Sequence, residues 1–140
     1  MEIRRTVLLA DANEEFRTML REIIDATETF TVVGSVGDGA KVLELAEQES
    51  PDLILMDVVL PGVDGFGVLK RLREQEGEMP KVILVSAFCT DSAVTEAVEL
   101  GASYFLPKPV EQNALLDRMA AVFSQKAPEE EHPAELKNLV

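Results

Sequence analysis

Residues 51–57 read PDLILMD, a short apolar run that ends in an aspartate. Four consecutive apolar residues between turn-forming residues are typical of a strand that is buried on both faces, as in a parallel sheet. The run ends at Asp57, and three more apolar residues follow at positions 58–60. A carboxylate with apolar neighbours on both sides needs partners or a cation to remain charged. We therefore expect Asp57 to be a functional residue at the end of a central strand.

The same pattern extends outward from this strand in both directions. Each apolar run is followed by a segment with apolar residues at helical spacing. Asn13 and Asp64 are suitable N-caps, and Gly101 lies where a helix commonly ends in glycine. Five strands alternating with five helices predict an α/β domain with a parallel sheet covered on both faces. The predicted strands are Thr6–Ala10, Phe30–Val36, Leu53–Met56, Lys81–Val85 and Tyr104–Leu106.

Polar residues stand at the ends of four of these strands. In open α/β sheets, ligands bind beyond the carboxyl ends of the strands, where the strand order reverses. In a flavodoxin-like order, 2-1-3-4-5, the first and third strands are neighbours at that point. Asp11 and Asp57 should then face each other across the crevice, with Ser86 and Lys108 on its far side. Alone, Asp11 could be a helix cap, Ser86 a turn residue and Lys108 a surface lysine, but together with Asp57 the set predicts a site.

The set is suited to phosphoryl chemistry on a carboxylate. Asp57 would be the nucleophile and would form an acyl phosphate. A hard divalent ion such as Mg²⁺ prefers carboxylate and carbonyl oxygens and would screen the incoming group. Lys108 could pair with one phosphate oxygen, and the hydroxyl of Ser86 could donate to another.

Composition limits the other functions. The length of 140 residues indicates one domain, placed at residues 1–124, with an acidic tail rich in proline and glutamate at residues 125–140. A net charge of −13 argues against direct binding to nucleic acid. No apolar run is long enough to span a membrane, and no signal-peptide pattern opens the chain. A single cysteine, Cys89, suits a reducing compartment. We expect a cytoplasmic protein.

Several motifs carry a family resemblance. They are LLAD at 8–11, PDLILMD at 51–57, LPGVDG at 60–65, VSA at 85–87 and KP at 108–109. From about residue 6 to residue 123 the chain resembles the receiver (CheY-like) domains of two-component response regulators. The resemblance implies a flavodoxin-like (βα)5 fold and a signalling domain that is not an enzyme.

The resemblance also implies roles for individual residues. Asp57 would be the phosphoacceptor, Ser86 the switch hydroxyl and Lys108 the phosphate-pairing lysine. Phe105 matches the aromatic switch position, whose ring swings inward when the hydroxyl moves to the phosphate. The alternative for Phe105 is an ordinary core aromatic on a buried strand.

The chain departs from the family pattern after its first strand. Receivers usually carry two adjacent acids there, whereas this chain has Asp11 followed by Ala12. In the family the first apolar helix residue lies four positions past the second acid. Phe16 lies four positions past Ala12, so the second acid is the missing one. By resemblance that acid is a direct Mg²⁺ ligand.

The predicted metal site is therefore reduced. Its remaining ligands are Asp11, Asp57 and the backbone carbonyl of Val59. We expect weakened Mg²⁺ binding, with slow or metal-poor phosphorylation. Glu14 or Glu15 could compensate, although both also suit the exposed face of the first helix.

The resemblance implies partners as well. A histidine kinase or histidine phosphotransferase would supply the phosphoryl group, and a DNA-binding effector domain would follow the tail. The last helix and Phe105 suggest a face for homodimer formation or effector contact. Within the family, residues 86–88 and 101–105 are most similar to receivers of the master regulators of sporulation in endospore-forming bacteria, which implies transcriptional control of sporulation.

Two alternatives remain open. The first is a phosphorylation-independent receiver, an interaction module whose site has decayed at Ala12. The second is a hydrolase that passes through an aspartyl phosphate. Such phosphatases usually need a second acid two residues after the nucleophile, where this chain has Val59. No Walker-type phosphate loop is present, and the only histidine, His132, lies in the tail, which argues against histidine-based catalysis.

Overall fold

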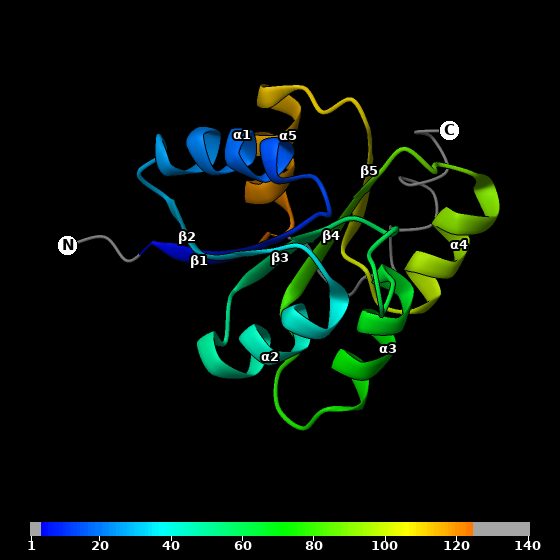
Figure 1. The fold of residues 1–140 in the computed structure, drawn as a ribbon. Coiled ribbons are helices and arrows are strands. Elements are labelled where there is room, and N and C mark those ends of the chain that lie inside the picture. The colour runs from blue at the N-terminus through cyan, green and yellow to red at the C-terminus, as the bar shows by residue number, and fades with distance from the viewer. Residues whose placement is uncertain (1–3, 125–140) are drawn as a thin grey trace.

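The computed structural model describes residues 4–124, and the proposed tail at 125–140 lies outside the described residues. Strands and helices alternate along the whole described range (Figure 1). None of the helices in this range is long and apolar enough to cross a membrane. The elements are β1 (Arg5–Ala10), α1 (Glu14–Asp25), β2 (Phe30–Val36), α2 (Gly39–Glu49), β3 (Leu53–Met56), α3 (Gly65–Glu74), β4 (Lys81–Ser86), α4 (Asp91–Glu99), β5 (Tyr104–Pro107) and α5 (Gln112–Ala121).

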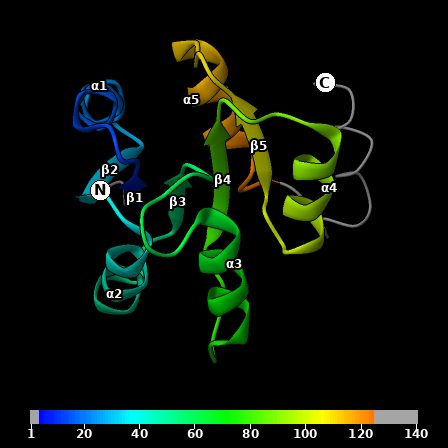
Figure 2. The same cartoon turned by 45° about the vertical axis from the view of Figure 1, so that its right-hand side comes forward.

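The five strands form one parallel sheet in the order β2-β1-β3-β4-β5, which confirms the predicted flavodoxin-like topology. Helices α1 and α5 cover one face of the sheet, and α2, α3 and α4 cover the other (Figures 1 and 2). The strand order reverses between β1 and β3. The carboxyl ends of these two strands therefore flank the crevice in which α/β sheets bind ligands.

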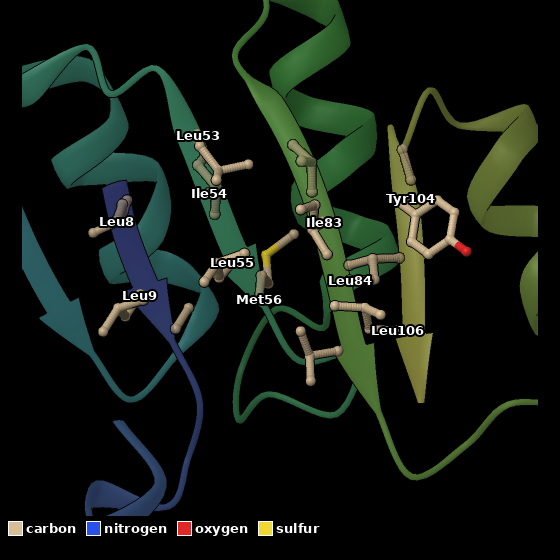
Figure 3. Packing of buried hydrophobic residues seen from close by; sticks show 14 of the residues in the cluster. Leu8, Leu9, Leu53, Ile54, Leu55, Met56, Ile83, Leu84, Tyr104 and Leu106 are labelled. Carbon is tan, nitrogen blue, oxygen red and sulfur yellow. The ribbon is translucent and has the colours of Figure 1, made fainter. Parts of the chain in front are cut away.

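The core is built on the three central strands, whose apolar side chains lie next to one another across the sheet (Figure 3). Every residue of β3 is buried, as are residues 7–10 of β1 and residues 82–86 of β4. Strands covered on both faces need apolar residues at consecutive positions, which explains the unbroken run at 53–56. Burial of each leucine or isoleucine side chain contributes about 1.5–3 kcal/mol to stability. The polar residues that follow the strand ends are therefore attached to a well-packed sheet.

The predicted helix starts are confirmed by their caps. Asn13 accepts a hydrogen bond from the backbone N–H of Phe16 (3.0 Å), and Asp64 accepts one from that of Gly67 (2.8 Å). Gly101 follows α4 with a positive φ of 95°, as expected of a glycine that ends a helix.

Three strand boundaries differ by one residue from the sequence prediction, and the first is the start of β1 at Arg5 in place of Thr6. Strand β4 continues to Ser86 and β5 to Pro107, because these two residues still pair in the ladder. The backbone N–H of Lys108 then donates to the carbonyl of Ser86 at 3.0 Å. The ladder thus carries the end of β4 and the residue after β5 to the same edge of the sheet.

Gly65 allows α3 to begin directly against the end of β3. Its N–H donates to the carbonyl of Val58 at 2.7 Å. A Cβ atom at position 65 would lie 2.7 Å from the carbonyl oxygen of Asp57 and 2.9 Å from the Cα of Val58. Both contacts are with backbone atoms, which cannot move aside without disturbing Asp57. Glycine at this position therefore helps to fix the residue at the centre of the site.

Candidate functional site

Asp11, Asp57 and Lys108 meet at the carboxyl edge of the sheet. The Nζ atom of Lys108 donates to Oδ2 of Asp11 at 2.8 Å and to Oδ2 of Asp57 at 2.9 Å. The two aspartates are only 4% and 9% exposed. Lys108 follows β5, on the far side of the crevice as expected, and its long side chain reaches back to both carboxylates.

The other oxygen of each carboxylate is held by the loop that follows it. Oδ1 of Asp11 accepts a hydrogen bond from the N–H of Asn13 (2.9 Å), and Oδ1 of Asp57 accepts one from the N–H of Val59 (3.1 Å). The sheet ladder also continues through Asp57, whose N–H donates to the carbonyl of Ala10 at 3.0 Å. Both carboxylates are therefore oriented before any ligand arrives.

The two carboxylates dominate the electrostatics of Lys108. Burial alone would lower the pKa of its ammonium, but the hydrogen bonds and negative charges of Asp11 and Asp57 outweigh burial and raise that pKa above its usual value. A pKa raised by folding contributes stability below the ordinary pKa of the group, and this stability is lost as pH rises through the folded value. The raised pKa therefore keeps Lys108 charged and paired at neutral pH, and this contribution to stability is lost in strongly alkaline solution.

Ser86, at the end of β4, and Phe105, on β5, are fully buried. The hydroxyl oxygen of Ser86 accepts a hydrogen bond from the N–H of Phe88 at 3.1 Å, which ties the residue to the loop before α4. The side chain of Phe88 is 62% exposed at the rim. Phe105 lies on β5 with its ring inside the core. This placement suits both an inward switch position and an ordinary core aromatic.

The carboxylate pair fits a Mg²⁺ ion only in part. Within residues 4–124 no group of three or more acidic, histidine or cysteine side chains could hold a metal. Ala12, Glu14 and Glu15 are all exposed, and neither glutamate joins Asp11 and Asp57 in such a group. However, both Oδ2 atoms already converge on one cation, the Lys108 ammonium. Mg²⁺ is commonly held by one or two carboxylates and several waters, so the two carboxylates suit a minimal site.

Sequence reasoning missed two residues in the first turn of α1. The guanidinium of Arg17 donates to the carbonyl of Asp11 (2.5 Å) and to the hydroxyl of Ser35 (2.9 Å). The ring of Phe16 faces Lys108, with Nζ 4.4 Å from its centroid. Helical spacing places both residues near the site, but no local pattern reveals contacts with residues 18 or 92 positions away.

Comparison with known proteins settles the family. A family model described as the response regulator receiver domain matches residues 7–120. The chain belongs to this family. Receiver domains are signalling domains of two-component systems, generally bind Mg²⁺ at their phosphorylation site, and interact with histidine kinases and effector domains.

Solved structures agree with the assignment of this receiver. It is similar to the receiver of the response regulator NarL from Mycobacterium tuberculosis, with 28% identity over 89% of this chain and 100% of that one and a TM-score of 0.84. The response regulator domain of CheB from Thermotoga maritima has 27% identity over 89% and 99% of the two chains, with a TM-score of 0.81. CheY from Borrelia burgdorferi, solved with CheX, BeF3 and Mg, has 25% identity over 86% and 90%, with a TM-score of 0.81.

Proposed function

We propose that this receiver accepts a phosphoryl group on Asp57 and that the acyl phosphate changes its contacts with partner proteins. The observation that carries the proposal is the position of Asp57. Its carboxylate is nearly buried, is oriented by the N–H of Val59, and shares Lys108 with Asp11 at the reversal of the strand order. An oriented carboxylate beside a cation is suited to attack a phosphorus atom whose oxygens carry negative charge.

The transfer step can be written with these residues. A carboxylate oxygen of Asp57 attacks the phosphorus of a phosphohistidine, a P–O bond forms and the P–N bond breaks. The leaving imidazole nitrogen keeps the electron pair and takes a proton from solvent. Lys108 then pairs with a phosphate oxygen, and the Ser86 hydroxyl, whose oxygen accepts from Phe88, donates to another. Mg²⁺, when bound, supplies further positive charge against the phosphoryl oxygens.

The metal site of this receiver is proposed to be weak. Asp11, Asp57 and the carbonyl of Val59 would hold Mg²⁺, and Ala12 contributes no ligand side chain. Fewer charged ligands lower the affinity of a site for a divalent cation. We therefore expect phosphorylation to need a high Mg²⁺ concentration.

Beryllofluoride, a mimic of the phosphoryl group, gives a test that needs no donor. NMR of the ¹⁵N-labelled protein should show that beryllofluoride with excess Mg²⁺ shifts the amide signals of Val59 and Phe88. Their N–H groups donate to Asp57 and Ser86, so both report directly on the groups that would bind the mimic. The amide of Asn13, bonded to Asp11, should also respond.

The Asp57→Asn protein is the matched control, because asparagine keeps the shape of the side chain and its amide oxygen can still accept from Val59. It should show no saturable shift. Saturable shifts at Val59 and Phe88 in the asparagine variant would place the mimic on another group and refute Asp57 as the acceptor.

The receiver would act between a phosphoryl donor and a responding domain. A histidine kinase or phosphotransferase would donate the phosphoryl group in the cytoplasm, and a DNA-binding effector domain or a second copy of the receiver would respond. The likeness of residues 86–88 and 101–105 to receivers of sporulation regulators supports a role in the transcriptional control of sporulation. The receiver would then be one step of a phosphorelay.

A second candidate function is a phosphorylation-independent interaction module. The observation that favours it is the exposed Ala12 beside a site that lacks a third metal-binding side chain within residues 4–124. Such a module would bind its partner equally well with Asp57→Asn. The buried, oriented carboxylates and their lysine favour the phosphoacceptor instead, because binding a partner without phosphorylation does not require this arrangement.

A further inference from the structure

Phe16 lies in the first turn of α1 with its ring against the ammonium of Lys108. The Nζ atom is 4.4 Å from the ring centroid, within the distance of about 6 Å at which a ring face attracts a cation. The same Nζ donates to Asp11 and Asp57 at 2.8 and 2.9 Å. The ammonium is therefore held between two carboxylates and one aromatic ring.

These contacts belong to a closed series that links four residues around the start of α1. Oδ1 of Asp11 accepts from the N–H of Asn13 (2.9 Å), and Oδ1 of Asn13 accepts from the N–H of Phe16 (3.0 Å). The Phe16 ring faces Lys108, and Lys108 donates back to Oδ2 of Asp11. Two hydrogen bonds from backbone N–H groups to side-chain oxygens thus fix the backbone of Phe16 relative to the Asp11 carboxylate, and the ring then lies against the lysine.

We propose that Phe16 is a positioning residue of this site, which holds the Lys108 ammonium over the Asp57 carboxylate before a phosphoryl group arrives. The proposal deepens the phosphoacceptor function proposed above and rests on it. A lysine side chain loses conformational freedom when it is fixed in one place, and each attractive contact offsets part of that loss. The face of an aromatic ring attracts a cation, whereas an aliphatic side chain of similar size does not.

Position 12 makes the ring more important in this chain. Alanine there brings no negative charge toward the lysine, so the ring adds an attraction at the same end of the site, from the first turn of α1. Because the ring is uncharged, it adds this attraction without competing for a divalent cation. An aromatic residue at position 16 should therefore matter for the rate at which Asp57 is phosphorylated.

The test compares Phe16→Leu with Phe16→Tyr in the whole chain. In the unphosphorylated wild-type protein, the ring current of Phe16 should move the ¹H NMR signals of the Lys108 Hε atoms upfield. Leucine should abolish that shift and lower the rate of acyl phosphate formation from acetyl phosphate, at saturating Mg²⁺, by about three- to tenfold. Tyrosine should retain both the shift and most of the rate.

Phe123→Leu is the control for general loss of an aromatic residue. The Phe123 ring is also half-buried and also faces a cation, the Arg5 guanidinium at 3.9 Å, but Arg5 begins β1 at the opposite edge of the sheet. This variant should leave the Lys108 signals and the rate unchanged. Thermal unfolding of each variant checks that the fold is retained.

Three results would overturn the proposal. These are no upfield shift of Lys108 in the wild-type protein, a Phe16→Leu rate equal to that of the wild type, and a Phe16→Tyr rate as low as that of Phe16→Leu. The NMR comparison needs no phosphodonor. Failure of the wild-type protein to form any acyl phosphate, with the ring-current shift present, would therefore refute the phosphoacceptor function and leave the Phe16–Lys108 contact established.

Discussion

Lys108→Met is expected to slow the phosphorylation of Asp57 by about a hundredfold or more, the usual effect of removing one charged or hydrogen-bonding group that stabilises a transition state. Methionine keeps the length and much of the apolar stem of lysine but has no charge. The Nζ atom is the donor to both Asp11 and Asp57. Its loss would leave the phosphoryl oxygens without this positive charge. Acyl phosphate formation from acetyl phosphate at saturating Mg²⁺ gives the rate.

The same variant should bind Mg²⁺ more tightly, by about tenfold, because removal of the ammonium frees both Oδ2 atoms and leaves one more unbalanced negative charge. Opposite changes in rate and metal affinity separate a role in chemistry from a loss of folding, which would weaken both. Lys108→Arg keeps the charge and should be intermediate in rate. A Lys108→Met protein that is phosphorylated as fast as the wild type would contradict the role assigned to this lysine.

Ala12→Asp is expected to tighten Mg²⁺ binding by about ten- to a hundredfold, because it adds a charged oxygen ligand next to Asp11. Ala12 is exposed in the middle of the β1–α1 loop, so an aspartate there requires no rearrangement of the core. Isothermal titration calorimetry measures the affinity. Phosphorylation at low Mg²⁺ should rise in parallel, and the difference should disappear once the metal saturates both proteins.

Ala120→Asp is the matched control for added charge, since Ala120 is an exposed residue near the far end of α5. It should leave Mg²⁺ affinity unchanged. Equal affinities for the wild-type and Ala12→Asp proteins would show that the alanine does not weaken the metal site.

Much of the fold could be predicted because local patterns and the needs of a parallel sheet agree. The run Leu53–Met56 has the same bounds in the sequence prediction and in the structure, and the caps at Asn13 and Asp64 begin their helices as expected. The end of β4 was placed one residue short, because pairing of Ser86 with Pro107 depends on the register between strands. Register is a property of the assembled sheet, which no single segment records.

For the site, the sequence predicted its place at the carboxyl edge of the sheet but not the contacts between its side chains. The rule that ligands bind at the strand ends correctly placed Asp11 and Asp57 together. It could not show how far the flexible Lys108 side chain reaches, and it gave no sign of the Phe16 ring above it. These contacts depend on side-chain directions set by the packed fold. The predicted roles of Ser86, Phe105 and the Val59 carbonyl stay predictions, since each concerns a phosphorylated or metal-bound state.

The role of Asp57 as phosphoacceptor can be measured by intact-mass spectrometry after incubation with acetyl phosphate, at a series of Mg²⁺ concentrations and beside Asp57→Asn. The account predicts one added phosphoryl group that appears only with Mg²⁺, needs a high concentration of it, and is absent from the asparagine variant. No adduct at any Mg²⁺ concentration, or an equal adduct on Asp57→Asn, would contradict it. In the first case, an Ala12→Asp protein that gains the adduct would show that the missing acid alone had silenced the site.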